Sequence, residues 1–121
     1  MNLALPIAAA LLILIGLVHS YLGERYILIR LFRRDLPKLF GDDWFTRRTL
    51  RFAWHLLTVA CFGFAAILIV ATTATDFRHA TLLVIAATFL ITALIAGGFT
   101  KGRHLSWVVF LVIAVLTYLA A

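Results

Sequence analysis

The sequence has little charge and a single cysteine. Charged residues make up 13% of the 121-residue chain and hydrophobic residues 64%, and the mean hydropathy is +1.09. This composition excludes an ordinary water-soluble domain, because so much apolar surface could not be hidden in one interior. Cys61 lies within an apolar run, so an internal disulfide and paired-cysteine redox chemistry are both excluded.

Four apolar runs fill most of the chain and predict membrane-spanning helices. A helix needs about 20 residues to cross a hydrocarbon core about 30 Å thick. Strands are not expected, because no alternating pattern is present and lipid requires every backbone group to be paired. Short connections after the second and third runs favour antiparallel neighbours. We therefore predict an all-α fold, an integral membrane antiparallel four-helix bundle that forms one domain over residues 1–121. The spans are expected at residues 3–22, 52–72, 80–98 and 105–121.

The basic residues are distributed unevenly along the chain. Ten of the eleven lie in residues 23–51 or 101–103, and only Arg78 lies elsewhere. Because Lys and Arg are retained in the cytoplasm, we expect both segments on the cytoplasmic side and both termini on the non-cytoplasmic side of a bacterial inner membrane. The net charge of +6 lies beside the spans, where it acts on topology and lipid headgroups. Nucleic acid is therefore not an expected partner.

The cytoplasmic link, residues 23–51, begins with an amphipathic pattern. Over residues 26–40, basic and apolar side chains would lie on opposite faces of a helix. This predicts an interfacial amphipathic helix on anionic lipid headgroups, either separate from the first span or continuing it, with Pro37 interrupting its last turn. Charges that only set the topology would also explain the pattern. The headgroup contacts would be Arg30, Arg33, Arg34 and Lys38. Residues 41–43 predict a turn, with Asp43 as the cap of the next helix.

Three histidines and the only glutamate are expected at one depth. His19, His55 and His104 lie at the cytoplasmic ends of three spans, and Glu24 lies just beyond the first. Imidazole and carboxylate ligands suit zinc, non-haem iron, copper or nickel, and Glu24 is the available general base. These four residues are the candidate metal ligands. Because Glu24 follows His19 by about 140° around a helix, both face one site only if the helix bends near Gly23.

Haem b is the second candidate cofactor, held between His19 and His55 of facing helices. Gly16 and Gly23 would clear one face of the first span for a porphyrin, but they would equally allow close contact with another helix. Covalent c-type attachment is excluded, because no Cys-x-x-Cys-His segment is present. His79 lies at the outer boundary and is expected only to meet water there.

Polar residues also form a stripe on each of the first two spans. Ser20 and Glu24 share one helix face, and a second stripe consists of Arg51, His55 and Thr58. A purely structural interpretation is that the histidines bond to backbone, lipid phosphate or water. Glu24 would then pair with one of the arginines at positions 25, 51 and 103.

Small residues on the third span form a row at positions 88, 92 and 96, which a second row at positions 93 and 97 adjoins. Such residues let helices approach closely in lipid. Packing within the bundle is the simpler interpretation of this row, and a homodimer is the alternative.

Three segments resemble a group of small bacterial four-span inner-membrane proteins to which no activity is assigned. They are His19–Arg25, Leu50–His55 and Lys101–His104. The resemblance covers most of the chain and implies no reaction. The leading hypothesis for function is therefore a transition-metal or haem site at the cytoplasmic helix ends. The alternatives are a non-catalytic accessory or assembly subunit of a larger membrane complex, and a small dimeric transporter.

Overall fold

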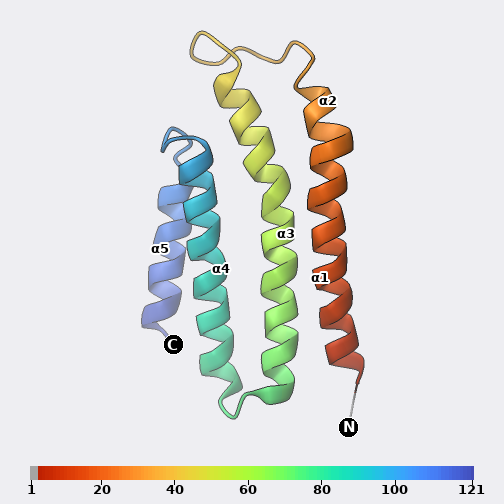
Figure 1. The fold of residues 1–121 in the computed structure, drawn as a ribbon. Helices are drawn as coiled ribbons and strands as arrows, with labels where there is room; N and C mark the ends of the chain where they lie inside the picture. The colour runs from red at the N-terminus through yellow and green to blue at the C-terminus, as the bar shows by residue number, and fades with distance from the viewer. Residues whose placement is uncertain (1–2) are drawn as a thin grey trace.

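The computed structural model describes residues 3–121, and this part of the chain is helical without strands (Figure 1). The first long helix runs unbroken from Ala4 to Leu31, although its hydrogen-bond pattern changes on the way. It consists of α1 (Ala4–Leu22), a π-helical segment η1 (Gly23–Leu28) and α2 (Ile29–Leu31). The chain continues as α3 (Trp44–Thr73), α4 (Phe77–Phe99) and α5 (Ser106–Leu119).

Three of the four helices are long and apolar enough to cross a membrane. The helix from Ala4 to Leu31 has 28 residues, α3 has 30 and α4 has 23. At 1.5 Å per residue these helices are about 42, 45 and 35 Å long, and each exceeds the hydrocarbon core of about 30 Å. Because α3 begins at Trp44 rather than at residue 52, its first turns extend beyond the apolar run.

The fourth apolar run forms a shorter helix than the sequence predicts. α5 has 14 residues and is about 21 Å long. The end of the chain nevertheless reaches the far end of α4. Arg78 Nη2 donates to the Ala120 carbonyl at 3.2 Å, and the His79 ring donates to the Ala121 carbonyl at 2.7 Å. The fourth segment therefore lies alongside most of α4, and His79 bonds to the chain rather than meeting only water.

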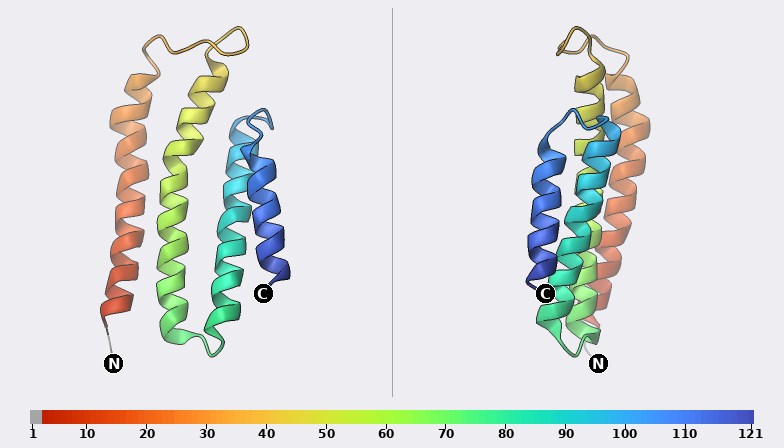
Figure 2. Two further views of the ribbon diagram at one scale, coloured as in Figure 1. Left: turned by 180° about the vertical axis from the view of Figure 1, so that it is seen from behind. Right: turned by 90° about the vertical axis from the view of Figure 1, so that its left-hand side faces the viewer.

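The helices pack in the order in which they follow along the chain. α1 packs against α3, α3 against α4, and α4 against α5. Within residues 3–121, no close backbone approach joins α1 to α4 or α5, or α3 to α5. Figure 2 shows α1, α3 and α4 side by side, with α5 against α4. The bundle is therefore open, and many large apolar side chains lie on its outer surface.

Small residues form the interfaces around α4. Gly63 of α3 lies so close to α4 that an added Cβ would be 2.7 Å from the Thr88 hydroxyl oxygen. On the other side of α4, Gly97 contacts the Trp107 ring of α5. The buried members of the row are Thr92, Ala93 and Ala96. The small residues predicted to pack within the bundle therefore do so.

The predicted interfacial helix does not form as a separate element. Its first half continues the first long helix to Leu31, and residues 32–43 form an irregular link. Pro37 prevents the helix from continuing through the link, because it lacks a backbone N–H and disfavours helical backbone in the preceding residue, but the helix already ends at Leu31. Phe40 and Gly41 then turn the chain with φ values of +60° and +96°. Arg30, Arg33, Arg34 and Lys38 therefore do not share one helix face, since only Arg30 lies on a helix.

α3 begins directly after Asp43, as predicted, but its cap differs from the expected one. The Asp43 carboxylate pairs with Arg47 Nη2 at 2.5 Å and caps no backbone N–H. This hydrogen bond from Arg47 lowers the pKa of Asp43 below its usual value. The carboxylate of Asp42 instead accepts the Trp44 N–H at 3.0 Å. Arg47 also donates to the Phe32 carbonyl, which ties the link to α3.

We expect Gly63→Ala to destabilise the α3–α4 interface by about 1–3 kcal/mol, the usual cost of overpacking. The added methyl group would collide with the Thr88 side chain, whose hydroxyl donates to the Val84 carbonyl. Gly98→Ala is the matched control, because its Cβ would meet no atom within 4 Å. Heating the protein in detergent and measuring the remaining monodisperse fraction by chromatography should give a lower midpoint for Gly63→Ala alone, which Thr88→Ala restores. Equal midpoints for the two glycine variants would contradict this contact.

Candidate functional site

A polar cluster lies between the first long helix and α3, near the α2–α3 link. The Glu24 carboxylate accepts two hydrogen bonds from Arg51, with Nη2–Oε1 2.7 Å and Nε–Oε2 3.3 Å apart. The same carboxylate lies 3.2 Å from Nε2 of His55. The side chains of Glu24, Arg51 and His55 are 31%, 32% and 23% exposed. These charges are therefore partly enclosed by the chain, and each helix supplies the partner of the other.

Two hydroxyl groups extend the polar cluster deeper between the helices. Ser20 Oγ lies 2.8 Å from Nδ1 of His55 and 2.5 Å from Oγ1 of Thr58. Thr58 is buried and donates to the Gly16 carbonyl at 2.9 Å. The two polar stripes recognised in the sequence therefore face each other. The side chains of the polar cluster are Ser20, Glu24, Arg51, His55 and Thr58.

His19 belongs to a neighbouring contact rather than to the polar cluster. Its ring stacks on Trp54, with centroids 4.7 Å apart and an interplanar angle of 4°. Nε2 of His19 donates to the Trp54 carbonyl at 3.1 Å, and the Trp54 indole donates to the His19 carbonyl at 3.2 Å. The helix becomes π-helical at Gly23, the position at which a bend was expected to bring His19 and Glu24 to one site. His19 and Glu24 nevertheless contact different groups of α3.

His104 lies on the other side of α3. Its ring stacks near Phe45, with centroids 5.7 Å apart, and meets the edge of Phe52 at 5.1 Å. Nδ1 of His104 lies 2.7 Å from the Ser106 hydroxyl. His104 therefore joins the α4–α5 loop to α3, whereas the polar cluster joins α1 and η1 to α3.

The four predicted metal ligands are thus divided among three places, and only His55 and Glu24 are adjacent. Across residues 3–121, no group of three or more His, Cys, Asp or Glu side chains is arranged to hold a metal ion. Both ring nitrogens of His55 bond to protein groups, as does one each of His19 and His104. The arrangement fits a helix–helix contact with an acid–base pair in it better than a ligand set.

The glycines predicted to make room for haem make room for α3 instead. A Cβ on Gly16 would lie 3.2 Å from the Phe62 ring and 3.3 Å from Cβ of Cys61. A Cβ on Gly23 would lie only 1.9 Å from Nε1 of Trp54. The face of α1 that a porphyrin would require is therefore packed against α3 side chains, which is the second of the two interpretations open from the sequence.

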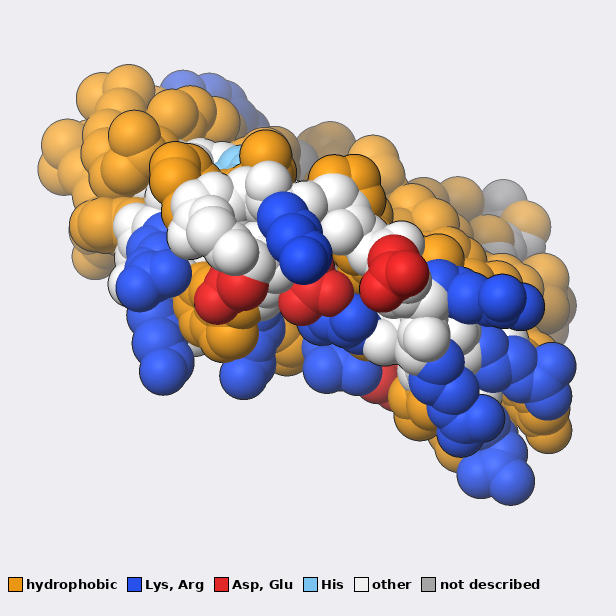
Figure 3. Space-filling model, turned by 90° about the horizontal axis from the view of Figure 1, so that it is seen from above, with side chains coloured by type: hydrophobic (Ala, Val, Ile, Leu, Met, Phe, Trp, Pro, Cys, Tyr) orange, Lys and Arg blue, Asp and Glu red, His pale blue; other side chains and the backbone are white. Residues whose placement is uncertain are grey.

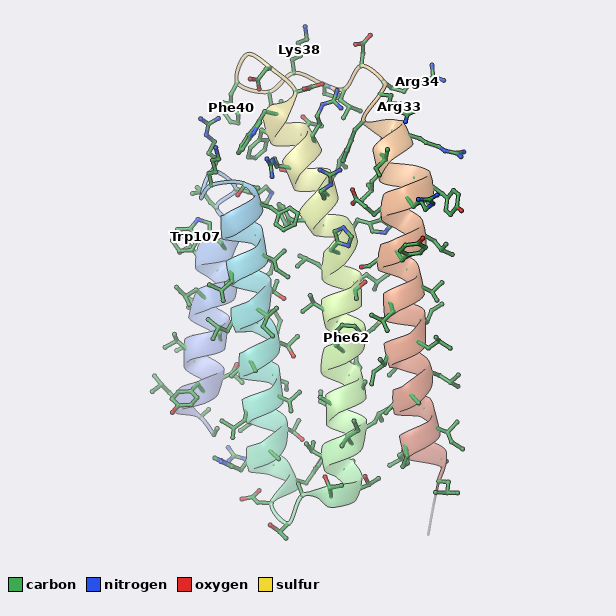
Figure 4. All side chains as sticks on the ribbon, in the orientation of Figure 1. Arg33, Arg34, Lys38, Phe40, Phe62 and Trp107 are labelled. Carbon is green, nitrogen blue, oxygen red and sulfur yellow. The ribbon has the colours of Figure 1, made fainter. Side chains whose placement is uncertain are left out.

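The cations predicted to contact lipid lie at the end of the molecule that carries the α2–α3 link. Figure 3 shows Lys and Arg side chains across this end, with Asp and Glu side chains between them. Arg30 lies 5.7 Å above the Tyr26 ring. Arg33 and Arg34 follow the end of α2, and Lys38 extends from the link away from the helices (Figure 4). These four cations are dispersed and exposed rather than gathered.

Sequence reasoning missed Trp54 as a member of this region. Its indole covers Gly23 and His19, and its carbonyl holds the His19 ring. The sequence contained a signal for Trp54, because it directly precedes His55. Gly23, which lacks a side chain, leaves the space that an indole ring needs. The pairing of Ser20 with Thr58 was also missed, although each lies on a stripe recognised from spacing alone.

Removing one charge of the Glu24–Arg51 pair should cost more than removing both. Arg51→Ala leaves a half-buried carboxylate without its main partner, whereas Glu24→Gln combined with Arg51→Ala leaves no unpaired charge. We expect a favourable coupling of about 1 kcal/mol between the two sites in a double-mutant cycle of thermal unfolding. Arg25→Ala is the control, since Arg25 makes no ion pair in residues 3–121. Additive effects of Glu24→Gln and Arg51→Ala would contradict a direct pair.

Known proteins give no independent guide to the role of this cluster. No family model matches the chain, and neither a curated protein nor a solved structure does so. The contacts made by Glu24, Arg51 and His55 are therefore the basis for any statement about what the protein does.

Proposed function

We propose that this chain is a non-catalytic accessory or assembly subunit of a larger membrane complex. The observation that supports this role is the use of the polar side chains within the membrane-spanning part. Ser20, Glu24, Arg51, His55 and Thr58 bond to one another or to backbone across the α1–α3 interface. They hold two helices together and leave little ligand capacity for a metal or haem.

The remaining surface of the chain suits contact with other molecules. In the apolar stretches of the three long helices, only 11%, 11% and 22% of residues are buried within the chain. The row of helices leaves α1 packed against a single neighbour, α3. In a membrane, this surface is covered by lipid or by helices of partner proteins, whose close packing supplies the association energy.

The proposed topology is a multi-pass antiparallel bundle in a bacterial inner membrane, with both termini on the non-cytoplasmic side. Its support is the concentration of ten basic residues in residues 23–51 and 101–103, because such residues are retained in the cytoplasm. The three long helices supply the spans by length. The fourth segment has 14 helical residues, and the contacts of its end with Arg78 and His79 at the start of α4 support its proposal as another span.

Single cysteines test this orientation in a Cys61→Ser background. Thr75→Cys in the α3–α4 link should react with a membrane-impermeant maleimide in intact spheroplasts. Lys38→Cys in the α2–α3 link should react only after the membrane is opened. The reverse pattern would overturn the orientation, and labelling of both positions without opening would overturn the four-span topology.

The role as a subunit is tested on the full-length protein extracted with its surrounding lipid. We expect it to migrate in a native gel as part of a larger assembly of defined composition, with no Soret absorption and less than stoichiometric transition metal by mass spectrometry. A monomer that carries one equivalent of metal, lost in both His55→Ala and Glu24→Gln, would overturn the proposal and support a metal site. A Soret band lost in His19→Ala and His55→Ala would support haem instead.

A further inference from the structure

The start of α3 brings three cations onto one tryptophan. The first turns of α3 lean over the loop between α4 and α5 (Figure 1). The Trp44 ring there lies 5.5 Å from the Arg48 guanidinium, 5.8 Å from the Lys101 ammonium and 5.0 Å from the Arg103 guanidinium. Two segments far apart in the sequence therefore build one basic surface, the Trp44 site, which consists of Trp44, Arg48, Lys101 and Arg103.

Unlike the two other arginines at the start of α3, these three cations have no acidic partner in residues 3–121. Arg47 pairs with Asp43, and Arg51 pairs with Glu24. Within residues 3–121, Arg48, Lys101 and Arg103 form no ion pair. Asp42 is the nearest acidic residue along the chain to Trp44 that has no ion pair, and its carboxylate accepts the Trp44 N–H. Three like charges around one ring repel one another unless an anion lies among them.

We propose that the Trp44 site binds the phosphate of an anionic phospholipid. Tryptophan is favoured at the boundary between lipid and water, where its ring is apolar and its edge is polar. Basic pockets at helix ends on the cytoplasmic side are a recognised mode of binding such headgroups. The site therefore supplies both the charge for the phosphate and a ring suited to this depth.

Apolar side chains beside the Trp44 site favour a lipid over free phosphate. Leu105, two residues beyond Arg103, is 72% exposed, and Phe40 in the α2–α3 link is 81% exposed. Phe40 packs against Phe45, the residue after Trp44, with ring centroids 5.3 Å apart. An acyl chain descending from a phosphate at Trp44 would cover such surface, and inorganic phosphate would not.

The proposed orientation decides only which leaflet supplies the lipid. The lipid site does not depend on the proposed role as a subunit. If labelling gives the expected orientation and the Trp44 site binds no lipid, this inference alone is wrong. If the protein binds lipid at Trp44 and carries a stoichiometric metal, only the subunit proposal is wrong.

The experiment compares two triple variants with the same change in charge. Arg48→Gln with Lys101→Gln and Arg103→Gln removes the Trp44 site, and Arg30→Gln with Arg33→Gln and Lys38→Gln removes three dispersed cations. Native mass spectrometry of the full chain in detergent measures retention of phosphatidylglycerol, with phosphatidylcholine as the neutral lipid. Because each cation near such a headgroup is worth roughly a factor of five, we expect the first variant to lose about tenfold or more of its affinity. The second should lose about threefold or less.

Equal losses in the two triple variants would overturn the proposal, because they would indicate attraction by overall charge alone. Equal retention of phosphatidylcholine would do the same. Inorganic phosphate that displaces the lipid at millimolar concentration would identify a site for the free anion instead. If the first triple variant does not fold, Arg103→Gln alone provides the test against Arg33→Gln. Both residues are exposed and lie outside the helices, and only Arg103→Gln should weaken phosphatidylglycerol binding.

Discussion

The contact between α1 and α3 is the constraint on which the rest of this structure depends. α1 packs against no other long helix in the described chain, so this interface alone attaches it. In lipid, apolar surfaces gain little by leaving the solvent, and association relies on close packing and hydrogen bonds. Gly16 and Gly23 allow the close packing, and the Glu24–Arg51 pair and its extension through His55 supply the hydrogen bonds. Residues whose types suggest a catalytic or metal-binding site therefore hold α1 and α3 together.

Much of the fold was predictable because lipid imposes simple rules on a sequence. Length and hydropathy located the helices, and spacing identified the polar stripes of α1 and α3. The sequence could not show that these stripes face each other, because that depends on the rotation of each helix in the packed state. For the same reason, His19, His55 and His104, which were expected at one depth, do not gather in one place. α3 contacts α1 through His55 and the α4–α5 loop through Phe45 and Phe52.

The ends of the helices were harder to predict than their centres. Hydropathy places the second span only from residue 52, whereas the turn at residues 41–43 correctly predicts a helix that begins after Asp43. α3 starts at Trp44, where Arg47 and Asp43 stabilise the first turn. The amphipathic pattern after Tyr26 looked like one helix, but the helix ends at Leu31, and an irregular link that contains Pro37 and the turn at Gly41 follows it. Local hydrogen bonds and backbone restrictions decide such boundaries, and hydropathy does not report them. As a consequence, the cations that gather on one surface lie around Trp44 at the start of α3 rather than in the α2–α3 link.

The π-helical segment also sets the rotation, about the helix axis, of the second part of the first long helix relative to the first part. Its wider turn adds a residue between the region that holds Ser20 and the region that holds Arg30. Glu24 and Leu28, four positions apart, both lie within it, and Leu28 is 2% exposed. If the same residues took ordinary α-helical pitch, everything after them would be rotated by about 100°, the turn of one residue. The segment thus acts as a register shift, which keeps the Glu24 carboxylate on α3 while setting the direction that Arg30 and the residues after it face.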